Sequence, residues 1–249
     1  NIPIYLGGCL AHRFDIELPA YVKRLDVVRE KYQDIVDRSL IDYKKPFWNT
    51  ELKDDADEFE TGNLFRHSYP LKIGAGCHGK CKYCTIRDTR GETYYTDAYL
   101  RVEEFLSHDD IVLISDSPTV TQIKDWCHIA KRYNKSISFR NVEPVVAVIC
   151  ADELLDLAHK KLLKIFHCPI QSNKPDILRA MKRDVDTTLS FIDIAQELRN
   201  FGTKVATNII IDYVVDGKIM HNMPEDWLND HFDYWSWNPY FDGNWDYKK

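Results

Sequence analysis

From residue 69 onward, short segments rich in β-branched and aromatic residues alternate with segments of helical periodicity. We expect strands at residues 69–73, 110–115, 136–140, 162–170, 204–212 and 232–238. We expect helices at residues 98–107, 118–133, 151–160, 175–182, 187–201 and 224–231. Such alternation predicts an α/β fold with a parallel sheet, either open or closed into a partial barrel. Sites in these folds gather at the carboxyl ends of the strands.

The loop after the first expected strand concentrates cysteines. The segment GAGCHGKCKYC places Cys77, Cys81 and Cys84 within eight residues, separated by three and then two residues. Structural zinc takes four ligands, usually from two paired knuckles, and no second knuckle follows here. A four-iron cluster held by three cysteines leaves one iron open to a cofactor. The spacing therefore favours an iron–sulfur cluster over zinc or an accidental grouping.

The composition suits a globular chain without a membrane span. Its 249 residues, 44% of them hydrophobic, can build one α/β barrel or two modest domains. A formal net charge of −6 weighs against a broad nucleic-acid surface, although Lys80, Lys82, Arg87 and Arg90 make the cysteine loop locally basic. No apolar run approaches the roughly 20 residues of a membrane helix, and no leader is evident. We expect a cytoplasmic protein with no membrane partner, in which clustered cysteines are ligands rather than disulfides.

The segment YPLKIGAGCHGKCKYCTIRDTRG resembles the cluster loop of the methylthiotransferase family of radical S-adenosylmethionine (SAM) enzymes. In that family an Arg-Gly pair, here Arg90 and Gly91, follows the last cysteine. The block at residues 167–186 is similar to the family's His-x-Pro-x-Gln segment and the Met-x-Arg that follows it. The matching residues are His167, Pro169, Gln171, Met181 and Arg183. The segments ATNIII at residues 206–211 and YLGGCLAH at residues 5–12 resemble the fifth barrel strand and the end of the family's N-terminal domain.

This resemblance implies a partial (β/α)6 barrel of the radical SAM type. Cys77, Cys81 and Cys84 would be the catalytic ligands of a [4Fe–4S] cluster. The residues that it implies for SAM binding are Tyr83, Asp116, Gln171, Arg183 and Asn208. Cys9 would bind a possible second, auxiliary [4Fe–4S] cluster, whose other two cysteines lie upstream in the family. Because the chain starts at Asn1 rather than methionine, we expect a segment before it.

The resemblance also implies a reaction. The open iron of the cluster chelates SAM, and electron transfer into the sulfonium gives a 5'-deoxyadenosyl radical that abstracts hydrogen from carbon. The implied function is sulfur or methylthio insertion into a tRNA base or a protein side chain. An electron donor such as flavodoxin or ferredoxin would be the partner.

Three regions are expected along the chain. Residues 1–48 would be the end of a methylthiotransferase N-terminal-like domain, with a short first strand and a helix over residues 20–40. Residues 49–66 would be an acidic linker, and residues 67–249 the partial barrel with an aromatic tail.

Departures from the family leave two alternatives open. An aromatic, acidic tail stands in place of the family's RNA-binding β-barrel, and SDSP stands in place of Gly-Gln after the second strand. One alternative is a radical SAM enzyme that modifies a peptide or small molecule without sulfur insertion. The other is a non-catalytic iron–sulfur protein. Gln171, Met181 and Arg183 favour an enzyme, because a bare electron carrier needs no cofactor pocket.

Overall fold

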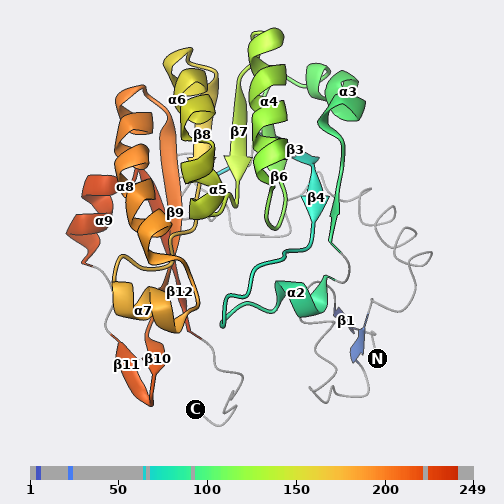
Figure 1. Cartoon of the computed structure of the whole chain (residues 1–249). Coiled ribbons are helices and arrows are strands. Elements are labelled where there is room, and N and C mark those ends of the chain that lie inside the picture. The colour runs from blue at the N-terminus through green and yellow to red at the C-terminus, as the bar shows by residue number, and fades with distance from the viewer. Residues whose placement is uncertain are drawn as a thin grey trace, which may run out of the picture.

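A six-stranded parallel sheet forms the centre of the protein (Figure 1). The computed structural model describes residues 4–6, 22–24, 64–65, 68–90, 93–220 and 224–240. The strands of the sheet, in spatial order from one edge, are β3 (Tyr69–Lys72), β6 (Ile111–Ile114), β7 (Ile137–Arg140), β8 (Leu163–His167), β9 (Lys204–Ile211) and β12 (Tyr234–Pro239). This order follows the chain, as in a partial (β/α)6 barrel, so the predicted fold class is confirmed.

Helices connect successive strands and cover one face of the sheet (Figure 1). They are α3 (Val102–Leu106), preceded by a 3-10 turn η2 (Ala98–Arg101), α4 (Val120–Arg132), α5 (Pro144–Ile149), α6 (Ala151–His159), α7 (Pro175–Ala180), α8 (Val185–Asn200) and α9 (Glu225–His231). A further short helix, α2 (Ile86–Thr89), follows the cysteines. Two small antiparallel pairs stand outside the sheet: β4 (Gly74–Ala75) with β5 (Tyr94–Tyr95), and β10 (Tyr213–Val215) with β11 (Lys218–Met220).

Helix α4 shows how the sequence determines where a helix begins and which of its faces is buried. Thr119 caps its first turn in a reciprocal capping box with Gln122, which satisfies two backbone N–H groups. Ile123, Trp126 and Ala130 recur at helical spacing and are fully buried against the sheet. The helix therefore begins at its cap and turns one apolar stripe inward.

The two faces of the sheet differ in polarity. Alternate residues such as Leu71, Leu113 and Phe139 point to the helix-covered face and belong to the main core. Their neighbours on the strands point to the other, concave face, where polar side chains mix with apolar ones such as Val112 and Ile114. The side chains on that face include Lys72, Ser138, Arg140, His167, Asn208 and Ser236. The concave face is therefore available for polar ligands.

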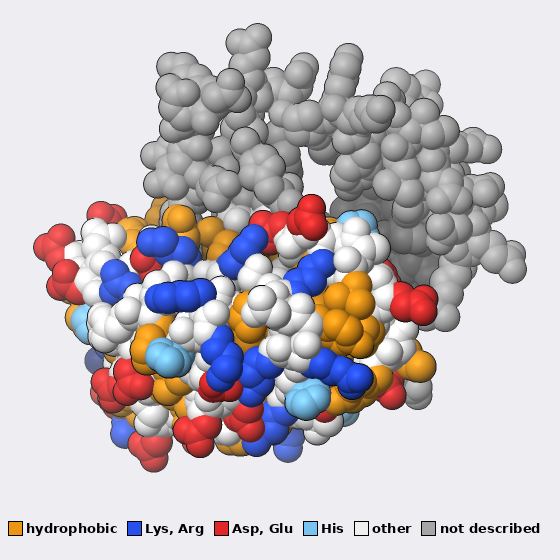
Figure 2. Space-filling model, turned by 90° about the horizontal axis from the view of Figure 1, so that it is seen from above, with side chains coloured by type: hydrophobic (Ala, Val, Ile, Leu, Met, Phe, Trp, Pro, Cys, Tyr) orange, Lys and Arg blue, Asp and Glu red, His pale blue; other side chains and the backbone are white. Residues whose placement is uncertain are grey.

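The amino ends of the strands, at the top of Figure 1, carry mixed charge. Figure 2 shows Lys and Arg side chains interspersed with Asp and Glu across this end. Lys131 and Lys160 both pair with Asp156, and Lys164 lies 3.4 Å from Asp110. Within these exposed pairs the positive and negative charges neutralise each other.

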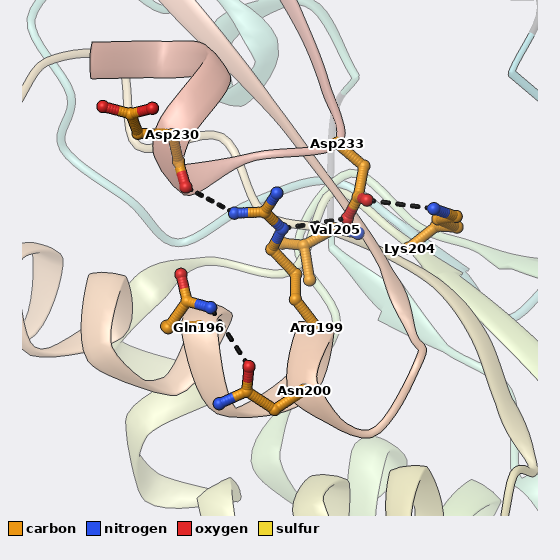
Figure 3. A network of polar contacts seen from close by, with 7 residues as sticks. All are labelled: Gln196, Arg199, Asn200, Lys204, Val205, Asp230 and Asp233. Atoms are coloured by element: carbon orange, nitrogen blue, oxygen red, sulfur yellow. Dashed lines mark hydrogen bonds and ion pairs between the residues drawn. The ribbon is translucent and has the colours of Figure 1, made fainter.

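A polar network fastens the last strand at the same end (Figure 3). Asp233 accepts the backbone N–H of Val205 at 2.9 Å and pairs with Arg199 at 3.3 Å and Lys204 at 3.1 Å. Arg199 also donates to the carbonyl of Asp230. One carboxylate thus joins α8, β9 and the segment between α9 and β12.

The N-terminal expectation needs one correction. Val22–Arg24 is a strand, β2, which pairs in parallel with β1 (Ile4–Leu6), so the helix expected over residues 20–40 is wrong at its start. Pairing between distant segments supplies backbone hydrogen bonds that periodicity cannot reveal. Cys9, Gly91 and residues 49–63 of the expected acidic linker lie outside the described residues. The proposed domain boundaries stay predictions.

None of the helices within the described residues combines the length and the apolar character that crossing a membrane requires.

Candidate active site

The cysteine loop leaves the carboxyl end of the sheet through a narrow base. Gly74 of β4 pairs with Tyr95 of β5, and a Cβ atom at Gly74 would lie 2.9 Å from the carbonyl oxygen of Tyr94. Gly76 has φ +86°, and a Cβ there would lie 2.8 Å from the Cα of Thr93. Both positions need glycine, because a side chain would push the two arms of the loop apart.

Asp116, directly after β6, anchors this loop. Its Oδ2 accepts the backbone N–H of Gly76 at 2.9 Å and lies 3.5 Å from Nε of Arg90. The carboxylate thereby connects the start of the loop to its far arm. The resemblance implied a cofactor contact for Asp116, and that role stays a prediction beside this anchoring role.

The three cysteines of the loop are partly buried, and none of them forms a disulfide. Sγ of Cys77 accepts the backbone N–H of Gly79 at 3.1 Å, and the Cys77 thiol donates to Glu143 Oε1 at 3.4 Å. Burial raises the pKa of the Cys77 thiol above its ordinary value. Among the described residues, no three His, Cys, Asp or Glu side chains converge on a single metal ion. A four-iron cluster makes a different demand, since each thiolate binds a separate iron.

Arg183 joins the cysteine loop to the segment at residues 167–186 that carries the second part of the family resemblance. Its Nη1 lies 3.8 Å from Sγ of Cys81 and donates to the Tyr83 hydroxyl at 3.2 Å, and Nη2 donates to the Pro169 carbonyl at 2.9 Å. The backbone N–H of Lys82 also donates to the Met181 carbonyl at 3.0 Å. Burial raises the pKa of Tyr83, so its hydroxyl stays protonated. The two segments that carry the resemblance therefore meet in space.

Gln171 sits at the carboxyl rim in an unusual backbone conformation. It has φ +67°, and its backbone exchanges hydrogen bonds with Asn208 and Ile210 of β9 at 2.9 and 3.0 Å. Its Oε1 is buried and has no hydrogen-bond partner among the described residues. The same is true of Nε of Arg183. Buried polar atoms without partners are costly, so their presence points to a ligand. The three thiols of the loop, which lie outside any disulfide, and these two atoms fit a cluster and a polar cofactor.

His167 and Asn208 form a chain of hydrogen bonds across the concave face. Nδ1 of His167 accepts the backbone N–H of Asn141 at 3.1 Å, and its Nε2 donates to Asn208 Oδ1. The amide of Asn208 donates in turn to Ser236. Burial lowers the pKa of His167 to about 4, so the ring is neutral near pH 7. This chain fixes the orientation of Asn208, whose contact with a cofactor stays a prediction.

Glu143 is a site residue that sequence reasoning missed. Its Oε1 accepts the Ser117 hydroxyl at 2.9 Å as well as the Cys77 thiol, and it lines a cavity of about 270 Å³ with Cys81 and Arg183. The available signal was its position, since Glu143 follows β7 and precedes the first residue of α5. Polar residues at that edge of a parallel sheet are candidate site residues.

Three further cysteines among the described residues lie outside the loop. Cys127, Cys150 and Cys168 are fully buried in the main core. Burial raises the pKa of each thiol, which keeps all three protonated and unreactive.

Comparison with known families agrees with this geometry. The sequence model described as the Radical SAM superfamily matches residues 71–220, which include the cysteine loop, Gln171 and Arg183. The chain belongs to the radical SAM superfamily. It is a radical SAM enzyme, and its cofactors are a [4Fe–4S] cluster and SAM.

Distant relatives of this radical SAM enzyme are methylthiotransferases. It is 24% identical to the ribosomal protein uS12 methylthiotransferase RimO of Thermosipho melanesiensis, over 86% of this chain and 53% of the relative. It is 27% identical to a probable threonylcarbamoyladenosine tRNA methylthiotransferase of Archaeoglobus fulgidus, over 57% of this chain and 38% of the relative. The chain thus spans about half the length, or less, of the curated relatives it matches.

A solved structure shares the fold. The radical SAM methyltransferase TsrM of Kitasatospora setae, with cobalamin and a [4Fe–4S] cluster bound, superposes with a TM-score of 0.52 at 10% identity. The superposition covers 69% of this chain and 36% of that one. At this identity the likeness concerns the fold alone.

Proposed function

We propose that this radical SAM enzyme is of the methylthiotransferase type and inserts sulfur or a methylthio group into a tRNA base or a protein side chain. The contact of Arg183 with Cys81 and Tyr83 carries the proposal, because it unites the two segments that resemble that family. The names of the relatives, which act on tRNA or on a ribosomal protein, support the same class.

In this proposal the residues of the loop hold the cluster and the rim holds SAM. Cys77, Cys81 and Cys84 are the cluster ligands. The residues assigned to SAM are Tyr83, Asp116, Gln171, Arg183 and Asn208. When bound, the two cofactors supply radical chemistry that removes hydrogen from an unactivated carbon.

The protein's own groups position this assembly and limit water. Asp116 fixes the loop through Gly76, and Arg183 holds the middle of the loop through Tyr83. Gln171 and Arg183 present buried polar atoms without protein partners, which SAM can satisfy. Because these atoms are buried, a cofactor bound to them is shielded from solvent.

Sulfur insertion assigns a further role to Cys9. We propose that it is one ligand of an auxiliary [4Fe–4S] cluster in a methylthiotransferase N-terminal-like domain that ends near residue 48. Flavodoxin or ferredoxin would be the electron donor.

Two measurements on anaerobically reconstituted enzyme test this function. Formation of 5'-deoxyadenosine from SAM reports the radical chemistry. Mass spectrometry of tRNA and of ribosomal protein uS12, incubated separately, reports replacement of hydrogen by a methylthio group. Deoxyadenosine without that mass gain would favour a radical SAM enzyme that inserts no sulfur. Absence of both products would favour a non-catalytic iron–sulfur protein.

A further inference from the structure

Three exposed lysines gather beside the cysteine loop. Lys80 and Lys82 flank Cys81 within the loop, and Lys182 follows Met181 in the turn after α7. The backbone N–H of Lys82 donates to the Met181 carbonyl at 3.0 Å, so the two segments lie side by side. Lys80 and Lys182 also line the same cavity of about 270 Å³. Lys80, Lys82 and Lys182 thus form a lysine cluster.

This lysine cluster lies toward the helix-covered side of the sheet. The walls of the cavity include Pro144 and Val145 in the first turn of α5, and Thr187 and Thr188 in the first turn of α8. Both helices belong to the layer that covers one face of the sheet (Figure 1). Asn208, which is assigned to SAM, points to the opposite, concave face. A protein seated on the lysine cluster would therefore leave the concave face open to SAM and the substrate.

The positive charge of the lysine cluster is not neutralised within the part of the chain that the structure describes. None of the ion pairs between described residues includes a lysine of the cluster. The two carboxylates that line the cavity face other groups. Asp184 accepts the backbone N–H of Thr187 at 2.8 Å, and Glu143 accepts the Ser117 hydroxyl at 2.9 Å. The cluster is thus a local positive surface on a chain of formal net charge −6, and such a surface attracts an acidic partner.

The lysine cluster borders the cofactor site of the proposed function. Cys81, one of the three proposed cluster ligands, lines the same cavity as Lys80 and Lys182. Arg183 forms part of the inner wall and lies 3.8 Å from Sγ of Cys81. An electron that enters from this surface therefore meets a ligand of the iron–sulfur cluster without crossing the concave face.

We propose that the lysine cluster is the docking surface for a small, acidic electron-transfer protein that reduces the iron–sulfur cluster. The reduced donor loses one electron and the iron–sulfur cluster gains it, while no bond breaks and no proton moves. Electron-transfer encounters are weak and bury less than about 1,200 Å² in total, so a few charges are enough to steer them. The inference rests on the proposed function and names the surface that its electron donor contacts.

An RNA partner fits these observations less well. Affinity for RNA comes mainly from many contacts between phosphates and basic side chains. Three lysines on a chain of net charge −6 make a small basic surface. The size of the lysine cluster therefore favours a protein with acidic side chains.

Stopped-flow oxidation of reduced flavodoxin by the anaerobically reconstituted enzyme tests the docking surface. The double variant Lys82→Glu/Lys182→Glu should lower the second-order rate constant about tenfold at low ionic strength, because the reversed charges repel the donor. Added salt should slow the parent and should change the variant little, since salt screens the attraction.

A matched control separates the position of the charges from their number. Arg132→Glu/Lys160→Glu makes the same change in net charge at the ends of α4 and α6, at the amino end of the sheet, and should oxidise flavodoxin as fast as the parent does. Dithionite is a small reductant that needs no docking surface. It should reduce the iron–sulfur cluster to the same extent in the parent and in both variants, as measured by electron paramagnetic resonance.

Three results would overturn the docking surface. The first is a parental rate in the lysine variant, and the second is an equal loss of rate in the control variant. The third is weaker tRNA binding by the lysine variant with an unchanged flavodoxin rate, which would assign the lysines to RNA. If the lysine variant misfolds, carbodiimide cross-linking of the parent to flavodoxin, mapped by mass spectrometry, should join Lys80, Lys82 or Lys182 to the donor. Cross-links confined to other lysines would also overturn the proposal.

The proposed function can fail separately. Oxidation of flavodoxin requires no methylthio transfer, so a rate that depends on the lysine cluster without a methylthio product would reject that function and leave the docking surface standing. A methylthio product together with a parental flavodoxin rate in the lysine variant would reject the docking surface alone.

Discussion

The two ends of the six-stranded sheet use charge in opposite ways. At the amino ends of the strands, Lys131 and Lys160 share Asp156, and Lys164 faces Asp110. At the carboxyl ends, Arg183 is buried against a thiol, a hydroxyl and a carbonyl. Paired, exposed charges contribute little to stability, whereas buried polar groups must find partners.

The carboxyl end of the sheet therefore contains features that lower the stability of the fold and that a bound ligand would compensate. Gln171 combines a positive φ with an unpartnered amide oxygen, and both features cost free energy. They lie at the carboxyl rim beside the cysteine loop, where a cofactor can offset them.

Removal of any one loop cysteine should abolish the cluster. Cys77→Ala, Cys81→Ala and Cys84→Ala each leave too few thiolates for a four-iron cluster, so iron content and visible absorption should be lost. Cys127→Ala, in the buried face of α4, is the matched control and should keep its iron. A loop variant with full iron content would remove that cysteine from the ligand set.

Arg183→Met should destabilise the carboxyl end strongly. It leaves the Tyr83 hydroxyl and the Pro169 carbonyl without their partner, at about 1–3 kcal/mol each, so we expect about 4 kcal/mol in the free energy of unfolding. Lys164→Met, at the amino end, should cost less than about 1 kcal/mol. Urea titrations of both variants measure the difference. An equal loss of unfolding free energy in the two variants would show that the carboxyl and amino ends of the sheet do not differ in this way.

His167 should make stability fall in mild acid. Burial lowers its pKa to about 4 from an ordinary value of 6.5, so the unfolded chain binds the proton more readily. This contribution is complete above pH 6.5 and is lost as the pH falls toward 4, and it amounts to at most about 3 kcal/mol. Urea midpoints from pH 4 to 8 should fall less steeply in His167→Gln than in the parent. Identical slopes would show that His167 is not buried as a neutral ring.

Replacing Gln171 should weaken SAM binding more than it lowers the free energy of unfolding. Gln171→Ala removes the unpartnered amide and should weaken SAM binding by about 1–2 kcal/mol, the scale of a lost buried hydrogen bond. Gln171→Gly should do the same while relieving the left-handed backbone by about 1 kcal/mol. Deoxyadenosine formation against SAM concentration measures the first effect, and urea unfolding measures the second. An unchanged SAM dependence in both variants would place Gln171 outside the pocket.

Local patterns in the sequence were enough to predict the sheet. The strand expected at residues 136–140 is Ile137–Arg140, and the last strand, expected at residues 232–238, is Tyr234–Pro239. Alternation and turn residues are local, so they are readable without the fold. The short antiparallel pairs β4–β5 and β10–β11 and the separate helix α5 carry too few residues for a periodic signal.

Contacts between distant segments could not be read in this way. The family resemblance placed Arg183 and the cysteine loop in one predicted site. The Glu143–Cys77 contact has no signature in the local sequence. The alignment of Lys72 with Arg140 has none either. Both depend on strand register, which only the assembled sheet defines. The same limitation explains the error at Val22–Arg24, where a distant strand decided the structure.

We propose that the cysteine loop and the rim of Gln171 and Arg183 form one site for a cluster and SAM. Electron paramagnetic resonance of the reduced, reconstituted protein tests it most directly. With three protein ligands one iron is open, so adding SAM should change the spectrum, and Arg183→Met should require a higher SAM concentration for the same change. A spectrum that stays identical with saturating SAM, or stoichiometric zinc in place of iron, would contradict the account.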